Sequence, residues 1–437
     1  MAKDLGASEK LISHLRKFRD DPWDEAVFKR TTLCVLDNLG CFCGGLEMPH
    51  FMQSATAVKN VLFPTGRVKS SQFLMAYLYG QAAIAMDYDD SFYGHPGSPV
   101  IGAILAVASG RNLTLDRILR GVAAGYEAHG ILCEASEPSS EHGAKVRSVG
   151  NLDTVAAALG ISVTLGLPDA FMDQIIGVSV AHTIVPYTAK WYERPVPGMK
   201  NNIGWIAAGA VLAVNLALEG QTGITSPIEG DRGLWRMIGS DRWKFDDDIL
   251  NNRPAVLRTG FKYYPACWHT QEYLKSFSVL LDQIDSQDDV TEINVFATPD
   301  LEKLCDRNVI GTADIAFSLP ALFECQIAGI EPGPLWEAFK PARVGCDFVY
   351  VQSVDRRIVV KTRRGHELCA TVELNSMSDG AQYGLDADGV VEKFSRLACA
   401  EMKLAAKVLL NREISSNVDG GENSSAQICS VVAKLII

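Results

Sequence analysis

The stretch SSQFLMAYLYGQAAIAMDYDDSFYGHPGSPVIGAILAVASG, residues 70–110, carries both the main fold signal and the densest polar cluster of the chain. Ser70 and Ser71 are suited to cap a helix, and the apolar residues after them continue it to about Ile84. A second apolar helix is predicted from near Ser98 to Gly110. Helices with so little polar surface predict an all-α domain with a buried central layer.

Further helical patterns lie on both sides of this stretch. Asp21 is suited to be an N-cap with Pro22 at the first helical position, and that helix is predicted to stop at Gly44-Gly45. Another helix is predicted to start at Thr114. The remaining predicted helices of this half cover the ranges 152–165, 169–185 and Ile203–Leu218. The first 250 or so residues are therefore predicted to be helical.

The pattern changes after Tyr264-Pro265. One more helix, 270–281, leads into Val290–Ala297, whose apolar residues alternate as in a strand. Arg357–Thr362 and the range 367–373 flank a turn and predict a hairpin. A helix over 390–410 follows, the tail 415–425 is expected to be flexible, and the apolar end 428–437 is expected to dock. The sequence thus predicts a mainly α protein with an inserted or appended α+β segment.

Composition limits the partners and the compartment. The chain has 41 Lys+Arg and 52 Asp+Glu, a net charge of −11. This acidity argues against binding of nucleic acid or anionic membrane, so an anionic ligand would need a local basic pocket. The 11 cysteines include no CxxC pair, which is typical of a reducing compartment. Without a signal-peptide pattern or a membrane-spanning run, we expect a cytoplasmic protein.

The first candidate site is the polar run at 87–97. Its three carboxylates, Asp87, Asp89 and Asp90, repel one another unless cations or donors compensate. We expect a helix end to bring Asp87 and Ser91 to a pocket, with His95 on the following loop. The alternatives are an acidic capping loop, a terpene-cyclase-like DxDD motif, and a metal site built from Asp87, Asp90 and His95. No second metal motif or aromatic repeat supports the last two.

Two basic loops form the second candidate site. Arg194 and Lys200 lie in a Pro- and Gly-rich segment directly before the Ala-rich helix Ile203–Leu218, and Lys145 and Arg147 stand similarly before another helix. Cations and free amides at a helix start bind anions. Each loop taken alone is equally consistent with solvated surface. Together they predict a ligand with more than one carboxylate.

The third candidate site is FKYYPACWHT, residues 261–270. His269 follows the rigid Tyr264-Pro265 turn at the boundary of the α+β segment, where ligand clefts are common. A capping or core histidine would show the same pattern. His142 is a weaker candidate. The other histidines have no polar constellation and are expected to be structural: His14, His50, His129, His182 and His366.

The sequence has no phosphate loop, no GxSxG elbow, no HExxH motif and no dinucleotide fingerprint. A carboxylate cluster, two basic loops and two histidines remain. This set suits abstraction of a proton next to a carboxylate: a base takes the α-proton, cations stabilise the enediolate, and an acid assists the leaving group.

The order of these clusters resembles the MmgE/PrpD family, which includes 2-methylcitrate dehydratase, cis-aconitate decarboxylase and iminodisuccinate epimerase. The most specific matches are AMDYDDSFYGHPGSPVIGAILA (85–106) and FKYYPACWHTQ (261–271). Weaker similarity is found in ERPVPGMKNNIGWIAAGA (193–210), ADIAFSLPALFECQIAG (313–329) and VEKFSRLACAEM (391–402). The resemblance therefore spans nearly the whole chain in the right order.

The resemblance implies a large all-helical domain, residues 1–268 and 389–437, plus a smaller α+β lid domain, residues 269–388. It also implies a homodimer with the active site between domains and no metal or organic cofactor. The residues that fall on catalytic positions are Asp87, His95, Lys200 and His269. Substrate-binding residues are expected at Ser91, Lys145, Arg147, Arg194 and Tyr264.

These observations predict a lyase that dehydrates a small polycarboxylate such as 2-methylcitrate or another alkylcitrate. The spacing of His269 after Tyr264-Pro265 is similar to that of the methylcitrate dehydratases. His269 or Asp87 would handle the proton, and His95 would assist departure of the hydroxyl. Two alternatives stay open: decarboxylation of cis-aconitate or epimerisation on the same fold, and an inactive family member that acts as a binding protein.

Overall fold

A computed structural model describes residues 6–143, 145–147, 150–184, 187–198, 202–284, 290–339, 346–373, 384–410 and 422–436. The helices before residue 150 are α1 (Ala7–Asp20), α2 (Glu25–Gly45), α3 (Pro49–Leu62), α4 (Gln72–Ile84), α5 (Gly97–Ala108), α6 (Leu115–Ala135) and α7 (Ser140–Gly143). The next are α8 (Asp153–Leu165), α9 (Asp169–Ser179), η1 (Val180–His182), η2 (Ala189–Tyr192), α10 (Ile203–Leu218), α11 (Leu234–Met237), α12 (Asp247–Leu250) and α13 (Ala255–Arg258).

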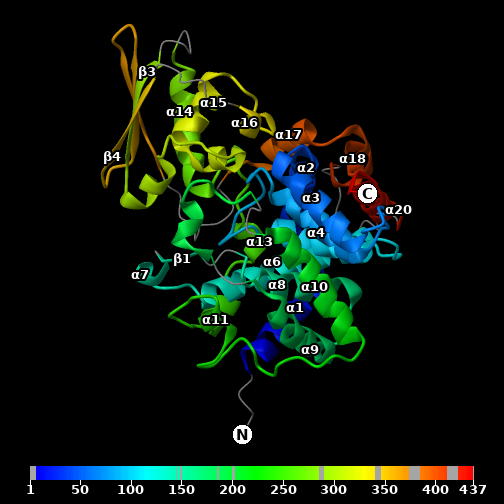
Figure 1. The fold of residues 1–437 in the computed structure, drawn as a ribbon. Coiled ribbons are helices and arrows are strands. Elements are labelled where there is room, and N and C mark those ends of the chain that lie inside the picture. Colours follow the sequence, from blue (N-terminus) through cyan, green and yellow to red (C-terminus); the bar gives the residue numbers. More distant parts are fainter. Residues whose placement is uncertain are drawn as a thin grey trace.

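The remaining helices are η4 (Trp268–Thr270), α14 (Gln271–Leu281), η6 (Pro299–Leu304), η7 (Thr312–Phe317), α15 (Leu319–Ile327), α16 (Leu335–Ala338), α17 (Ala387–Leu397), α18 (Ala400–Ala405), α19 (Lys407–Leu410) and α20 (Glu422–Ile436). The strands are β1 (Val146–Arg147), β2 (Tyr187–Thr188), β3 (Val290–Ala297), β4 (Asp347–Gln352), β5 (Arg357–Thr362) and β6 (Glu367–Thr371). The prediction of a mainly α fold is confirmed. Figure 1 shows most helices as one body, with β3 and β4 at its far end beside α14 and α15, whereas β1 lies nearer α7.

The helical body is built around α5. Every residue of α5 is buried, because its sequence GSPVIGAILAVA has no charged side chain and no polar face. The helices α2, α4, α6, α8, α10 and α20 all contact it. This arrangement is the buried central layer expected from the sequence, and it places the turn between α4 and α5 inside the protein.

The cap predicted at the start of α4 is confirmed: the Ser71 hydroxyl accepts from the Leu74 amide. The helix predicted to start at Thr114 also begins there as α6, and the Thr114 hydroxyl accepts from the Arg117 amide. The cap predicted for α2 is wrong. Asp24, not Asp21, accepts from the amides of Ala26 and Val27, and Asp21 instead ends α1. Pro22 therefore lies in the link between the two helices.

Replacement of Asp24 by alanine is expected to lower the free energy of unfolding by about 1 kcal/mol, because two amides at the start of α2 lose their acceptor. Asp21→Ala removes a carboxylate three residues earlier that caps no helix, and is expected to change stability by about 0.5 kcal/mol or less. Urea unfolding followed by circular dichroism measures both variants. Equal losses would show that α2 does not begin at the Asp24 cap.

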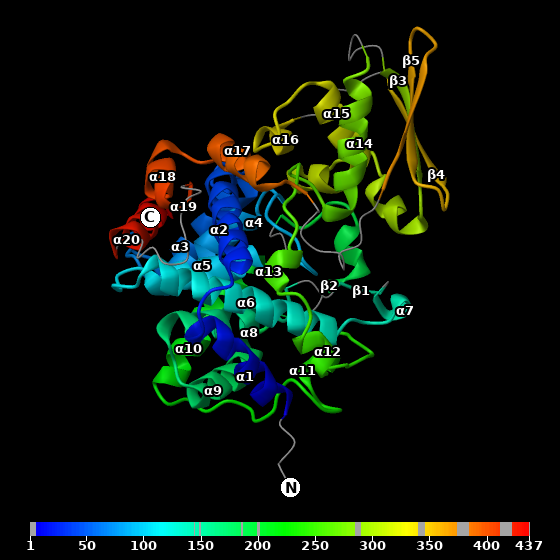
Figure 2. The same cartoon turned by 180° about the vertical axis from the view of Figure 1, so that it is seen from behind.

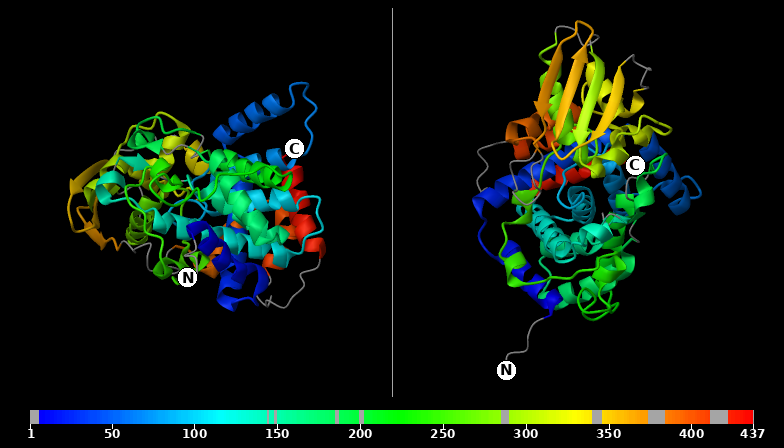
Figure 3. Two further views of the ribbon diagram at one scale, coloured as in Figure 1. Left: turned by 90° about the horizontal axis from the view of Figure 1, so that it is seen from below. Right: turned by 90° about the vertical axis from the view of Figure 1, so that its left-hand side faces the viewer.

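In the described part of the α+β segment, the strands form a mixed sheet in the order β4-β3-β5-β6. The pair β3–β4 is parallel, and β3–β5 and β5–β6 are antiparallel. The helix α14 packs on β5 and β6 and contacts α15. Figure 3 shows these strands at one end of the molecule, with the helical body below them in its right-hand view. The strand at Val290–Ala297 and the hairpin around residue 365 are as predicted.

Apolar side chains form a main cluster in the helical body and a second cluster under the sheet. The second cluster also takes in Trp191, Val196 and Cys267 from outside the range 269–388. The domain boundaries 1–268, 269–388 and 389–437 therefore stay a prediction.

The single helix predicted over 390–410 is instead the series α17, α18 and α19. Ala398 and Cys399 are extended, with ψ 138° and 165°, and break the first helix from the second. The α17 helix lies against α2, as seen from behind in Figure 2. The apolar C-terminal end docks as α20, where Ile428, Val432 and Ile436 are buried. Of the tail 415–425 that is expected to be flexible, residues 415–421 lie outside the described residues, and 422–425 belong to α20.

Candidate active site

The turn between α4 and α5 is buried although it carries several charges. Exposed fractions are 4% for Asp87, 0% for Asp89 and Asp90, and 7% for His95. Asp87 has φ +53°, a left-handed conformation that aspartate tolerates better than most residues. Ser91 pairs with Gly260 through two backbone hydrogen bonds of 2.9 Å, which tie the turn to the chain just before the third predicted cluster. Buried charges of this kind need partners, and the structure supplies them.

His95 lies between two of the carboxylates. Its Nδ1 is 3.0 Å from Asp89 Oδ1, and its Nε2 is 3.7 Å from Asp87 Oδ1. The Ser98 hydroxyl donates to Asp89 Oδ2 at 2.5 Å. The ring is thus held on one side and turned toward Asp87 on the other, which is the arrangement of a histidine oriented for proton transfer.

Asp87 is compensated by Lys262, which has an exposed fraction of 0%. The Lys262 ammonium donates to Asp87 Oδ1 and to the Asp87 carbonyl, each at 2.6 Å. In the same segment, the Tyr263 carbonyl accepts from the Tyr88 hydroxyl at 2.7 Å. The first and third clusters of the sequence therefore meet. Sequence reasoning missed Lys262, and the signal available was a charged residue inside the aromatic run FKYY.

A second buried lysine supports the same turn from the C-terminal helix α17. The Lys393 ammonium lies 2.8 Å from Asp37 Oδ1 of α2 and donates to the Tyr88 carbonyl at 2.6 Å. It also lies 3.9 Å from the centre of the Tyr88 ring. Arg396, one turn further on, donates to the Tyr88 hydroxyl at 2.9 Å. Residues about 300 positions apart thus fix Tyr88, directly beside Asp87.

The inner end of the turn is held by two further contacts. Asp90 accepts from the Gly97 amide at 3.1 Å and from the Tyr126 hydroxyl. A side chain at position 97 would displace this carboxylate, because a Cβ there would lie 2.8 Å from Asp90 Oδ1. His129 contacts Asp153 through Nδ1 at 2.5 Å and the Phe92 carbonyl through Nε2 at 2.6 Å.

His129 has an acceptor at each ring nitrogen. Burial by itself lowers the pKa of His129, but the Cys133 sulfur and the Asp153 carboxylate raise it well above its usual value. A charged imidazolium with both protons donated agrees with this geometry. His129, expected from the sequence to be structural, therefore holds the Phe92 carbonyl of the turn.

Replacement of Asp90 by asparagine is expected to stabilise the protein relative to wild type more at pH 8 than at pH 5. Burial and the Asp89 carboxylate raise the pKa of Asp90 from 3.8 to about 7. The folded state therefore holds this proton more tightly than the unfolded state. The bound proton on Asp90 therefore adds to the free energy of unfolding. This contribution is fully present below about pH 4 and is lost as the pH rises through about 7.

Urea unfolding at pH 5 and pH 8 tests this, and the gain should differ between the two by about 2–3 kcal/mol at most. Asp231→Asn removes a carboxylate that is 97% exposed and serves as the control. A gain for Asp90→Asn that does not depend on pH would contradict the assignment.

The other predicted site residues are placed as follows. Ser91 is buried at the pairing with Gly260, and Tyr264 is half-buried and stacks on Trp336 with ring centres 5.5 Å apart. His269 is exposed in η4, directly before α14. The structure shows no contact that assigns these three residues a ligand, so their roles remain predictions.

The predicted basic residues do not gather in the described part of the chain. The Arg194 guanidinium donates to the Phe317 carbonyl at 2.7 Å and lies 3.8 Å from Asp314. Lys145 is exposed and forms an ion pair with Glu141 at 2.9 Å. Arg147 contributes backbone to β1, paired with Tyr187 of β2. Lys200 lies outside the described residues.

Metal binding was an alternative for this turn. Among the described residues, Asp87, Asp89 and His95 offer ligand atoms within 4.8 Å of one another. The Lys262 ammonium and the Ser98 hydroxyl already contact these carboxylates. Positive charge therefore reaches the cluster from the protein's own side chains. This favours an acid–base site over a metal site.

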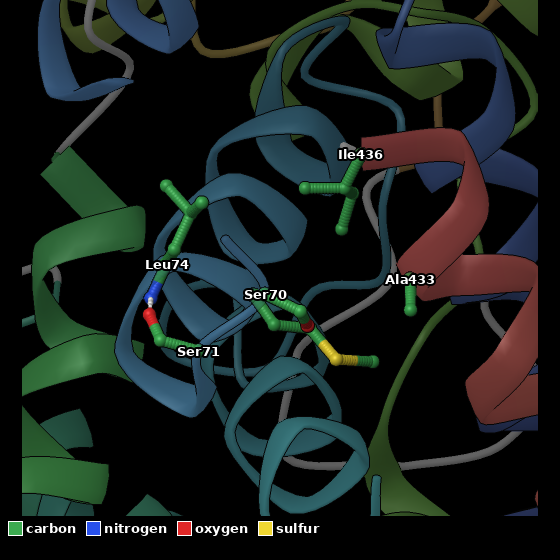
Figure 4. A pocket seen from close by; sticks show the side chains of 6 residues that line it. Ser70, Ser71, Leu74, Ala433 and Ile436 are labelled. Atoms are coloured by element: carbon green, nitrogen blue, oxygen red, sulfur yellow. Dashed lines mark hydrogen bonds between the residues drawn. The ribbon is translucent and has the colours of Figure 1, made fainter. Parts of the chain in front are cut away.

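A small hollow elsewhere in the described structure is apolar, unlike the charged turn between α4 and α5. It lies between the start of α4 and α20 and is lined mainly by apolar atoms, as Figure 4 shows. The residues that line it are Ser70, Ser71, Leu74, Met75, Ala433 and Ile436. It contains none of the predicted site residues, and its serine hydroxyl at position 71 is used as the α4 cap.

Fold and site together define a mainly α-helical protein whose buried turn combines carboxylates, a histidine and a lysine ammonium. The chain belongs to the MmgE/PrpD family: the model of the MmgE/PrpD N-terminal domain matches residues 9–246. This range runs from the first turn of α1 to beyond α11 and includes the turn with Asp87 and His95. The family covers dehydratase-like enzymes. A comparison with curated protein sequences gives no match.

None of the helices that the structure describes combines the length and the apolar character needed to cross a bilayer.

Proposed function

We propose that this chain is a lyase that dehydrates a small polycarboxylate, with 2-methylcitrate or a related alkylcitrate as the first choice, by acid–base elimination without a cofactor. The observation that carries the proposal is the buried set Asp87, His95 and Lys262, in a chain that belongs to the MmgE/PrpD family. Elimination next to a carboxylate needs a base for the α-proton, positive charge for the enediolate and an acid for the leaving hydroxyl.

Asp87 is the base that the geometry favours. Its Oδ1 is shared between the Lys262 ammonium at 2.6 Å and the His95 ring at 3.7 Å. The ammonium favours the ionised carboxylate in a site that excludes most water. His95 in its doubly protonated form would then donate the Nε2 proton to the departing hydroxyl, while its Nδ1 stays bonded to Asp89. His269 remains the alternative base, placed on the exposed η4 turn.

The substrate's carboxylates would be bound by cations. We propose Lys200 for this role, with Lys145 or Arg147 and Arg194, and hydrogen bonds from Ser91 and Tyr264. A protein of net charge −11 attracts a polycarboxylate only where such groups are concentrated. In the described residues, Lys145 and Arg194 are each engaged by an acidic partner, so binding of substrate would have to exchange these contacts.

The proposal includes three properties that the family resemblance suggests. These are a lid domain at 269–388, a homodimer with the active site between domains, and a cytoplasmic location. All 11 cysteines are free thiols, which agrees with a reducing compartment. Mass photometry or light scattering of the purified protein tests the dimer.

The reaction is tested by NMR in deuterated water with purified protein and a panel of 2-methylcitrate, citrate, cis-aconitate and iminodisuccinate. Loss of water from 2-methylcitrate with formation of an alkene is the expected result. Release of carbon dioxide would instead assign a decarboxylase, and α-deuterium exchange without an alkene would assign an epimerase. No turnover of any compound, with thermal stabilisation by one of them, would assign a binding protein. Each of the last three outcomes overturns the proposed dehydration.

A further inference from the structure

A chain of buried side-chain hydrogen bonds ends at His95. The Tyr79 hydroxyl of α4 donates to Asn38 Oδ1 of α2 at 3.0 Å, and Asn38 Nδ2 donates to the Ser98 hydroxyl of α5 at 3.3 Å. Ser98 donates to Asp89 Oδ2 at 2.5 Å, and Asp89 Oδ1 lies 3.0 Å from His95 Nδ1. Every member before His95 has an exposed fraction of 0%. No water is needed to complete this chain.

The direction of the chain follows from the chemistry of its members. An ionised Asp89 can only accept, so the single proton of Ser98 is committed to it. The Ser98 oxygen can then only accept from Asn38, which must present its amide nitrogen and turn its carbonyl oxygen toward Tyr79. Tyr79 must therefore donate. All the bonds point toward Asp89.

This direction fixes the state of the histidine ring. An acceptor-only carboxylate at 3.0 Å requires a proton on His95 Nδ1. The neutral ring then carries its lone pair on Nε2, so a second proton taken up by the ring is bound at Nε2 and is the one that the ring can transfer. Nε2 lies 3.7 Å from Asp87 Oδ1, the same oxygen that accepts from the Lys262 ammonium. A histidine's second hydrogen bond sets which nitrogen is available for chemistry.

We propose that Asp89, Ser98, Asn38 and Tyr79 are positioning residues that hold the Nδ1 proton of His95 toward Asp89 and direct Nε2 to the reacting atoms. The role of these residues in catalysis rests on the proposed function, whereas the position of the proton on the His95 ring does not depend on it. The members come from three helices and the turn, so the packing of α2, α4 and α5 around the turn sets the state of His95.

The packing around Tyr79 supports this assignment. The Phe42 ring stacks on Tyr79 with centres 4.6 Å apart and planes 9° apart. Gly102 of α5 leaves room for the Tyr79 ring, because a Cβ there would lie 2.8 Å from Tyr79 Cδ1. The phenol that begins the chain is thus held in one position by its neighbours.

The direct test is ¹⁵N NMR of the full-length protein labelled with ¹⁵N-histidine, with the His95 signals assigned by their loss in His95→Asn. In the neutral ring of the wild-type protein, Nδ1 is expected to be protonated and Nε2 unprotonated. Asp89→Asn is expected to move a major part of the population to the Nε2-protonated form, and Ser98→Ala to shift the Nδ1 signal. An Nε2-protonated neutral ring in wild type, or spectra unchanged in both variants, would overturn the inference.

Kinetics supply the second test if the protein has the proposed activity. Loss of an orienting carboxylate can cost up to about four orders of magnitude in kcat. We expect Asp89→Asn to lower kcat by about 100-fold or more, Ser98→Ala by about 10-fold, and Tyr79→Phe by about threefold or less, with KM little changed. This graded order along the chain is specific to positioning. Equal losses for Ser98→Ala and Tyr79→Phe would count against it.

Ser162→Ala is the matched control. Ser162 is also a serine of 0% exposure, and its hydroxyl donates to the Ala158 carbonyl within α8 at 2.8 Å. Ser162→Ala should leave the His95 spectrum and kcat unchanged. If Ser162→Ala lowered kcat as much as Ser98→Ala does, the loss would be a general effect of replacing a buried serine and would not show positioning of His95. If no substrate is turned over, the proposed function fails while the NMR result still decides the inference. If the variants turn over substrate normally with unchanged spectra, the inference alone fails.

Discussion

Replacement of His95 by alanine is expected to lower turnover by about two orders of magnitude or more, with the fold retained. The reason is that His95 Nε2 lies 3.7 Å from Asp87 Oδ1, and a positioned general acid or base contributes about 10²–10⁴-fold. Initial rates of alkene formation from 2-methylcitrate measure the effect, and the thermal midpoint of unfolding checks the fold.

Two further variants sharpen this experiment. His95→Asn keeps a side-chain donor near the position of Nδ1, so it can retain the bond to Asp89 but cannot transfer a proton. It should be as inactive as His95→Ala and closer to wild type in stability. His366→Ala removes an exposed histidine from the β5–β6 turn and should keep full activity. Rates near wild type for both His95 variants would discard the assignment.

Lys200→Ala is expected to lower turnover to a similar extent, because a cation that stabilises the enediolate lowers the reaction barrier about as much as the general acid does. This expectation comes from the sequence, since Lys200 lies outside the described residues. Its test is the same assay, with Lys190→Ala as the control for a nearby exposed lysine. Unchanged turnover would remove Lys200 from the site and leave Lys262 as the lysine beside Asp87.

The course of the helical body could be predicted because its signals are local. Ser71 and Thr114 are caps whose side chains bond the backbone within three residues, and the uncharged run of α5 has to be buried. The break between α17 and α18 could not be predicted. Ala398 and Cys399 are neither glycine nor proline, so the sequence there contains no stop signal.

The site was predicted in part for the same reason. The acidic turn and His95 stand out as a polar run between apolar helices, and in the structure the Lys262–Asp87 pair joins the 261–271 segment to this turn. The roles of the site residues stay predictions. Lys262 and Lys393 were missed, because a lysine on an amphipathic pattern is usually exposed. Their burial depends on partners far away in the sequence. The one local clue was Asp37, a charged residue within the apolar stretch of α2.

Replacement of Lys393 by methionine is expected to lower the free energy of unfolding by about 3–5 kcal/mol, because it leaves the buried carboxylate of Asp37 without its partner. Both side chains are at most 1% exposed. Burial by itself lowers the pKa of Lys393, and the Asp37 carboxylate outweighs this and raises it. Burial also raises the pKa of Asp37, even with the lysine beside it. Urea unfolding measures the loss, and Lys403→Met, at an exposed lysine of α18, is the control.

The pH dependence of this loss distinguishes an unpaired charge from lost packing. In Lys393→Met, Asp37 can stay buried only by taking up a proton, so its folded-state pKa rises further above the unfolded value. The stability that this proton contributes is lost as the pH rises, and the variant should therefore be weaker at pH 8 than at pH 5. The double variant Asp37→Asn/Lys393→Met has no charge to bury. It should be more stable than Lys393→Met at pH 8 and should lose the added pH dependence. If Lys393→Met lowered the free energy of unfolding equally at pH 5 and pH 8, Lys393 would stabilise the protein through its contacts with Tyr88 and not through the charge of Asp37.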